Sequence, residues 1–161
     1  MSQNFQLSDI LHVLLHMAER DGPTTSEALA AAMGTNPVVL RRLMAGMRSA
    51  GFVVSGKGHG GGWALGCDLE RITLGDVYLA LGEPRLISLG FREDHPTCLV
   101  AAAVNDAMRG VIQDAEALLL KRFGDITLAT LSADFHRRMT QQKAKGPTQP
   151  HQLEHHLHED D

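Results

Sequence analysis

Aromatic residues are scarce in this chain of 161 residues: Phe, Trp and Tyr together make up 4% of it, with one tryptophan and one tyrosine. Because 43% of the residues are hydrophobic, a packed core can still form, and its side chains must be mostly aliphatic or methionine. Only two cysteines occur, Cys67 and Cys98, which excludes a disulfide framework and a zinc ribbon. The length suits one domain, or one domain with an appendage.

Long apolar runs are also missing. No stretch approaches the ~20 residues that a membrane-spanning helix needs, and the opening MSQNFQLSD lacks the basic and apolar segments of a secretion signal. We therefore expect a cytoplasmic protein with reduced cysteines and no membrane partner. The segments that should form the core carry no converging set of acid, base and nucleophile, so we do not expect an enzyme.

Positive charge is limited in total but concentrated in one segment. The formal net charge is -4, yet no acidic residue occurs between Glu27 and Asp68. The basic residues of that segment are Arg41, Arg42, Arg48 and Lys57. Because the local field at a contact matters more than the total charge, this pattern is compatible with a nucleic-acid-binding surface.

The first third of the chain carries the signals of successive helices. Apolar residues recur at helical spacing over residues 8–20, and an Ala-rich helix is expected over residues 25–33. Thr24 and Glu27 have the spacing of a capping box for this second helix, and Gly34 ends it.

A third helix is predicted to begin at Asn36, a good N-cap, with Pro37 in the first helical position and Gly51 as the C-terminal stop. Its apolar side chains face inward, and its arginines, with Val38 and Val39, face solvent. Two helices joined by a tight turn indicate either a helix-turn-helix motif or a plain helical hairpin.

The Gly-rich stretch GKGHGGGWAL follows this third helix. Residues 52–55 and 62–66 have the character of short strands, and residues 56–61 would be the loop between them. A phosphate-binding loop would need its glycines to open a helix, and a flexible linker would not lead at once into Trp63. A β-hairpin after the helix-turn-helix, that is, a wing, fits the residues best.

The remainder is predicted to contain a short helix over residues 73–81, a loop, a long helix over 97–123 and a last short helix over 127–136. The long helix carries a heptad-like apolar seam that should pair with a second copy. Its members are Ala101, Val104, Met108, Val111, Ala115 and Leu118.

The expected organisation has three parts. Residues 1–84 form a winged-helix DNA-binding domain, residues 85–139 contain a loop and the dimerisation helix, and residues 140–161 form a disordered, His-rich acidic tail. The fold class is thus mainly α, with one small β-hairpin wing.

The segment TTSEALAAAMGTNPVVLRRLMAGMRSAGFVVSGKGHGGGWALGCDLERITLGDVYLALGEP resembles the Rrf-two family of bacterial winged helix-turn-helix transcription regulators. The match lies in the order of recognition helix, AGFV, basic and Gly-rich wing with an aromatic, and the helix beginning at IT. The resemblance implies a homodimer that binds a partly palindromic double-stranded DNA operator, in most members as a repressor.

Residues that match the family's DNA-binding positions are candidate contacts here. The resemblance puts Lys57 where many members have a minor-groove arginine, and Thr25 and Ser26 at a helix terminus that can bind phosphate. Arg41 or Arg42 could pair with a guanine edge, or both could contact phosphate. The full set is Thr25, Ser26, Asn36, Val38, Val39, Arg41, Arg42, Lys57, His59, Gly60 and Gly61.

Several relatives sense redox, nitric oxide or iron–sulfur signals, and cluster-binding members have three cysteines near the start of the long helix. This chain has only Cys98 there. His12 and His16, one helical turn apart, could join His95 and the other chain's Cys98 in an iron–sulfur or zinc site. The alternatives are Cys98 acting by oxidation without metal, or surface histidines with a packed cysteine.

A winged-helix module that binds protein without binding DNA is the main rival function. The negative net charge and the few basic groups favour it. DNA binding should weaken steeply as salt rises, whereas docking through an apolar face should not.

Overall fold

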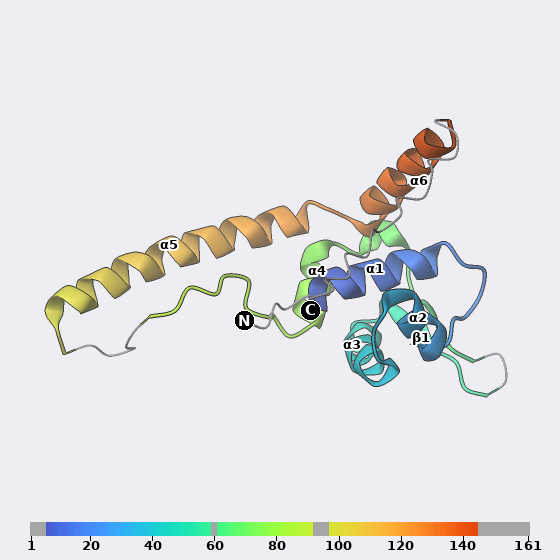
Figure 1. Ribbon diagram of the computed structural model, residues 1–161, viewed down its shortest axis with the longest axis horizontal. Helices are drawn as coiled ribbons and strands as arrows, with labels where there is room; N and C mark the ends of the chain where they lie inside the picture. The colour runs from blue at the N-terminus through green and yellow to red at the C-terminus, as the bar shows by residue number, and fades with distance from the viewer. Residues whose placement is uncertain (1–5, 59–60, 92–96, 145–161) are drawn as a thin grey trace, which may run out of the picture.

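The computed structural model describes residues 6–58, 61–91 and 97–144. Helices α1 to α4, the hairpin and the start of α6 form one body, from which α5 extends to one side (Figure 1). The elements are α1 (Gln6–Ala18), α2 (Ser26–Met33), α3 (Pro37–Ser49), β1 (Val53–Ser55), β2 (Trp63–Leu65), the 3-10 turn η1 (Leu69–Arg71), α4 (Leu74–Ala80), α5 (Leu99–Gly124) and α6 (Leu128–Ala144). The mainly helical fold with one small hairpin and a long late helix is as predicted.

The core is aliphatic, as the composition requires. Helix α1 supplies one face of it and α3 another, because their apolar residues recur at three and four positions. The hairpin and α6 close the remaining sides with Val53, Trp63 and Leu128. The members of this packed cluster that come from helices α1 to α4 are Ile10, Val13, Leu14, Met17, Leu29, Ala30, Leu40, Leu43, Met44, Met47 and Val77.

The hairpin pairs with the residue that precedes α2, and this corrects one prediction. The amide of Thr24 donates to the carbonyl of Trp63 at 2.9 Å, and the amide of Trp63 donates back at 2.8 Å. Thr24 is therefore buried, and Thr25 is the N-cap of α2, its Oγ1 accepting from the amide of Ala28. The predicted capping box of Thr24 and Glu27 is wrong because the returning strand recruits the backbone of Thr24.

Helix α5 is fixed to the body at its C-terminal end. The amide of Leu74 donates to the carbonyl of Ile126 at 2.9 Å, and the amide of Leu128 donates to the carbonyl of Ile72 at 2.8 Å. A capping box of Thr73 and Asp76 starts α4 at the same place. These bonds set the direction in which α5 leaves the body.

The last helix is longer than predicted. It continues to Ala144, past the expected end at His136, and therefore includes residues 140–144 of the expected disordered tail. Asp134 pairs with Arg137 and Arg138 one turn on, which supports the extension. The rest of the tail, residues 145–161, lies outside the described residues.

Candidate nucleic-acid interface

Helices α2 and α3 form a helix-turn-helix pair that presents the start of α3 to solvent. Gly34, in the left-handed region with φ 61°, ends α2, and the Oδ1 of Asn36 accepts from the amide of Val38 at 2.7 Å to start α3. Val38 is 67% exposed and Val39 is also exposed. The side chain of Asn36 thus has a capping role besides any contact with DNA.

The three arginines of α3 differ in their surroundings. Arg41 donates to Oε1 of Glu27 on α2 at 3.2 Å, and Arg48 lies 3.4 Å from Oγ of Ser55 at the end of β1. Arg42 is exposed and makes no hydrogen bond or ion pair within residues 6–58, 61–91 and 97–144. Two arginines are therefore held by neighbouring elements and one is available to a partner.

The start of α2 contains two residues with different environments. Thr25 is exposed, whereas Ser26 is only 8% exposed and its Oγ accepts from Nε1 of Trp63 at 2.9 Å. Because the indole nitrogen can only donate, this bond joins the hairpin to α2 through one buried pair. The hydroxyl of Ser26 points into the body.

A cleft of about 240 Å³ separates the start of α2 from the base of the wing. Its walls come from Thr25 to Glu27 on one side and from Ser55, Gly56 and residues 61–63 on the other. Backbone amides at a helix start and in a Gly-rich turn are suited to phosphate oxygens. Among the residues lining the cleft that the structure describes, Glu27 is the one with an acidic side chain.

The described part of the wing loop shows Lys57 exposed at its tip. Gly61 is required by the hairpin itself, since a Cβ there would lie 2.7 Å from the carbonyl oxygen of Gly56. The other two candidates in this loop, His59 and Gly60, lie outside the described residues.

The candidate sensing residues are not brought together within one chain. Nε2 of His12 lies 2.9 Å from Nε2 of His16 on α1, while Cys98 stands before α5 at the end that points away from the body (Figure 1). His95 lies outside the described residues, and those described contain no group of three potential ligands placed to hold a metal ion. Cys67 follows β2 and Cys98 precedes α5, so the described part of one chain gathers no cysteine ligand set for an iron–sulfur cluster.

Two of these groups have shifted acidities. Burial lowers the pKa of His16, and the charge of His12 lowers it further. The amides of Ala101 and Val100 at the start of α5 lower the pKa of the exposed Cys98 thiol, because they stabilise its thiolate.

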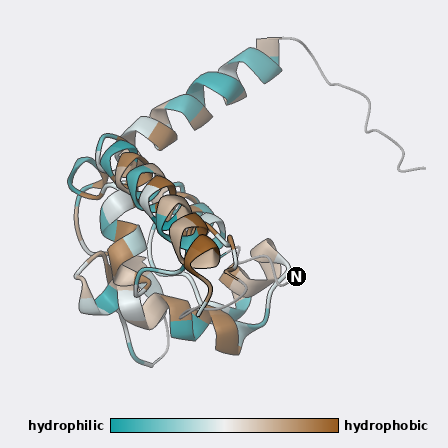
Figure 2. Cartoon of the chain, turned by 90° about the vertical axis from the view of Figure 1, so that its left-hand side faces the viewer, coloured by the Kyte–Doolittle hydropathy of each residue, from teal (hydrophilic) through white to brown (hydrophobic). Residues whose placement is uncertain are grey.

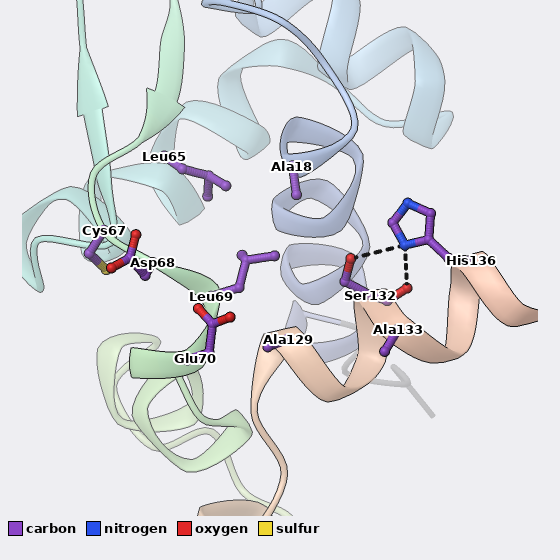
Figure 3. A pocket seen from close by; sticks show the side chains of 10 residues that line it. All are labelled: Ala18, Leu65, Cys67, Asp68, Leu69, Glu70, Ala129, Ser132, Ala133 and His136. Carbon is purple, nitrogen blue, oxygen red and sulfur yellow. Dashed lines mark hydrogen bonds between the residues drawn. The ribbon is translucent and has the colours of Figure 1, made fainter.

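A groove of about 520 Å³ lies between α6, the end of α1 and the segment that follows β2. In Figure 3, Leu65 to Glu70 lie across the groove from Ser132 and His136 of α6. Nδ1 of His136 is 2.8 Å from the carbonyl of Ser132, and Nε2 is 3.1 Å from Oε2 of Glu19. The contact between His136 and Glu19 links α6 to the end of α1.

Along α5 an apolar stripe is exposed. Val111 is 69% exposed and Leu118 is 62% exposed, and Val104 shares their heptad position. Figure 2, in which the outer end of α5 faces the viewer, shows hydrophobic stretches along this helix. The predicted seam is thus exposed at Val104, Val111 and Leu118, whereas Ala101, Met108 and Ala115 are half-buried.

Sequence patterns missed the contacts that join distant segments. The bond between Trp63 and Ser26 spans 37 positions, and the pair of Arg41 and Glu27 spans 14. The sequence did contain one signal for the pair of Arg41 and Glu27, since Glu27 is the last acidic residue before the acid-free segment that contains the arginines. The contact of Arg48 with Ser55 had no such signal.

Among the described residues, no helix has the length and apolarity to cross a membrane. The Rrf2 family model, described as "Iron-dependent Transcriptional regulator", matches residues 4–134. The HTH-type transcriptional regulator YwnA of Bacillus subtilis is 30% identical over 105 residues, which cover 65% of this chain and 77% of YwnA. IscR of Photobacterium profundum is 34% identical over 79 residues, covering 49% of this chain and 45% of IscR.

Solved structures share the fold. A transcriptional regulator from Lactobacillus plantarum superimposes with a TM-score of 0.70 at 23% identity, covering 88% of this chain and 96% of that one. CymR of B. subtilis, described as the global cysteine regulator, gives a TM-score of 0.56 at 21% identity, covering 83% and 97%. These relatives are transcription regulators and not enzymes. The chain belongs to the Rrf2 family of winged helix-turn-helix transcription regulators.

Proposed function

We propose that the protein is a homodimeric, sequence-specific DNA-binding regulator of the cytoplasm that represses transcription by occupying an operator. The observation that carries the proposal is the exposed face of α3, where Arg42 has no partner among the described residues and the first turn faces solvent. Entry of such a helix into the major groove would bring Arg42 to a guanine edge and Val38 and Val39 to thymine methyl groups.

Phosphate contacts would come from the residues around the cleft. The amides at the start of α2, next to Thr25 and Ser26, and the cap of α3 at Asn36 are suited to backbone phosphates. Lys57 at the wing tip is exposed, and with its neighbours His59, Gly60 and Gly61 it would follow the backbone towards the minor groove.

The operator would be bound by two copies. Helix α5 has 26 residues, which is about 39 Å of helix, and its exposed stripe repeats every heptad as in a paired helix. Val111→Asp would place a charge in this seam and should convert a dimer into a monomer in size-exclusion chromatography with light scattering. Asp114→Asn is the control on the same helix; a Val111→Asp protein that still ran as a dimer would refute this assignment.

The test of DNA binding begins with selection of bound fragments from the host genome, followed by anisotropy titrations on a recovered fragment. Arg42→Ala should weaken binding by about 5- to 150-fold, the worth of one bidentate base contact. Lys57→Ala should weaken binding of all sequences and reduce the slope of log affinity against log salt by about 1. Arg122→Ala and Lys121→Ala, at the C-terminal end of α5, are the matched controls.

A protein-docking module is the second candidate, and the apolar start of α3 favours it. Val38 and Val39 of α3 and Val54 of β1 are all exposed. Binding to a protein through them would change little with salt. If the selected fragments bind no better than bulk DNA, and their affinity does not depend on salt, this second candidate replaces the first.

We further propose that the regulator responds to oxidants or nitric oxide through Cys98. The thiol is exposed, and the amides of the first turn of α5 lower its pKa, which favours the reactive thiolate. Peroxide treatment should reduce the operator affinity of the parent protein and of Cys67→Ser, but not that of Cys98→Ser. Anaerobic reconstitution followed by iron and zinc assay tests a site completed by the partner chain; a colourless, metal-free dimer excludes it.

A further inference from the structure

Glu27 places a negative charge where the proposed function places a phosphate. Glu27 lies at the start of α2 and lines the cleft beside the wing, and it is the one charged residue among the described residues that line this cleft. A carboxylate beside a phosphate would oppose binding, because like charges at an interface repel. The face therefore needs a cation close to Glu27.

Arg41 is that cation. Its Nη1 lies 3.2 Å from Oε1 of Glu27, and the pair crosses the turn between α2 and α3. Arg41 occupies the edge of the exposed face of α3, whereas Arg42 lies on the line of Val38 and Ala45, which are four positions before it and three after it. The two arginines thus point to different parts of the interface.

We propose that Arg41 is a positioning residue that neutralises Glu27 at the phosphate cleft, and that of these two arginines only Arg42 reads a base. The proposal rests on the function proposed above and adds a division of labour to it. Glu27 holds the guanidinium of Arg41 against α2, and Arg41 keeps the carboxylate from repelling the DNA backbone.

The competing arrangement reverses the roles. If Arg41 itself contacts DNA, Glu27 competes with the DNA for the guanidinium. Removing the carboxylate should then raise DNA affinity only when Arg41 is present. If Arg41 instead screens Glu27, removing the carboxylate should raise DNA affinity mainly when Arg41 is absent. The two arrangements therefore predict coupling energies of opposite sign.

The experiment is a double-mutant cycle with Glu27→Gln, Arg41→Ala and the double variant, each titrated by anisotropy against a labelled duplex of mixed sequence. Arg41→Ala should weaken DNA binding about tenfold. In the Arg41→Ala background, Glu27→Gln should restore DNA affinity about tenfold. In the parent protein, Glu27→Gln should change DNA affinity less than about threefold. Arg41→Lys retains the charge and should bind as the parent does. The proposal is overturned if Glu27→Gln raises DNA affinity in the parent protein as much as, or more than, it does in the Arg41→Ala background.

Two controls separate the possible failures. The pair of Arg122 and Asp125, 3.4 Å apart at the end of α5, gives a matched cycle that should show no coupling in DNA affinity. On a fragment recovered by genomic selection, the Glu27→Gln, Arg41→Ala double variant should keep the ratio of specific to mixed-sequence affinity, and Arg42→Ala should lose it; the reverse pattern also overturns the proposal. If the parent protein binds neither duplex in a salt-dependent manner, the proposed function itself fails.

Discussion

Replacement of Ser26 by alanine tests how the wing is attached to the helix-turn-helix. Trp63 begins β2, and its Nε1 donates to Oγ of Ser26 at 2.9 Å in an environment where Ser26 and Trp63 are both buried. Ser26→Ala would leave the indole N–H buried without an acceptor. The backbone bonds between Thr24 and Trp63 would remain, so the hairpin should still form.

The expected cost follows from the buried donor. A buried polar group that loses its partner costs about 1–3 kcal/mol, and the loss of one hydroxyl oxygen leaves only a small cavity. We therefore expect Ser26→Ala to lower the free energy of unfolding by about 1–3 kcal/mol, which is about a 5- to 150-fold change in the unfolding constant. The same change should leave the salt dependence of DNA binding unaltered, because the hydroxyl points into the body.

Urea unfolding at fixed protein concentration provides the assay. Trp63 is the only tryptophan in the chain, so its emission reports directly on this contact. The midpoint should fall with an unchanged m-value. Ser132→Ala on α6, whose hydroxyl lies 3.5 Å from His136, is the control and should change stability by less than about 0.5 kcal/mol. An unchanged midpoint for Ser26→Ala would refute the view that this bond anchors the wing.

Other perturbations address α6, the hairpin and α1. Leu128 is 0% exposed, so Leu128→Ala should cost about 2–5 kcal/mol in urea unfolding; a cost below 1 kcal/mol would mean that α6 is not part of the cooperative core. Gly62 has φ +153°, and a Cβ there would lie 2.7 Å from the carbonyl oxygen of Thr24, so Gly62→Ala should cost about 1–3 kcal/mol and lower the melting temperature. The control is Gly90→Ala, since a Cβ at Gly90 would have no atom of the described residues within 4 Å. The lowered pKa of His16 means that the unfolded chain takes up its proton first, so the free energy of unfolding should fall as pH drops below about 6.5, until folded His16 is protonated too. His16→Gln should reduce this fall in urea titrations at several pH values, and an identical pH profile would contradict it.

Local signals were enough to place the elements of the winged helix. Asn36 and Pro37 start α3 as their positions in the sequence indicate, and Gly34 ends α2 in the left-handed conformation that glycine favours. Each of these signals acts over a few residues, so no tertiary contact has to be known. The exposed heptad stripe of α5 could likewise be predicted from local sequence, because it depends only on the spacing of residues along one helix.

Predictions failed where a distant segment supplied the partner. The spacing of Thr24 and Glu27 matched a capping box, but Thr24 pairs with Trp63 and Glu27 pairs with Arg41. Both partners come from elements that the local pattern does not include. A capping motif is a local preference of about 1 kcal/mol, and two backbone bonds to a returning strand outweigh it.

The same limit explains why the sequence left Arg41 and Arg42 equivalent. They are neighbours in an acid-free segment, and helical spacing alone turns both away from the core. What distinguishes them is the position of Glu27, one helix earlier, which engages Arg41 and leaves Arg42 without a partner in the described part of the chain. An ion pair of this kind contributes little to stability, about 0–1 kcal/mol at an exposed site. The ion pair matters in the complex with DNA, because only in that complex does a phosphate compete for the space beside Glu27. The sign of the coupling between Glu27 and Arg41 in DNA affinity therefore reports which of the two groups faces the duplex.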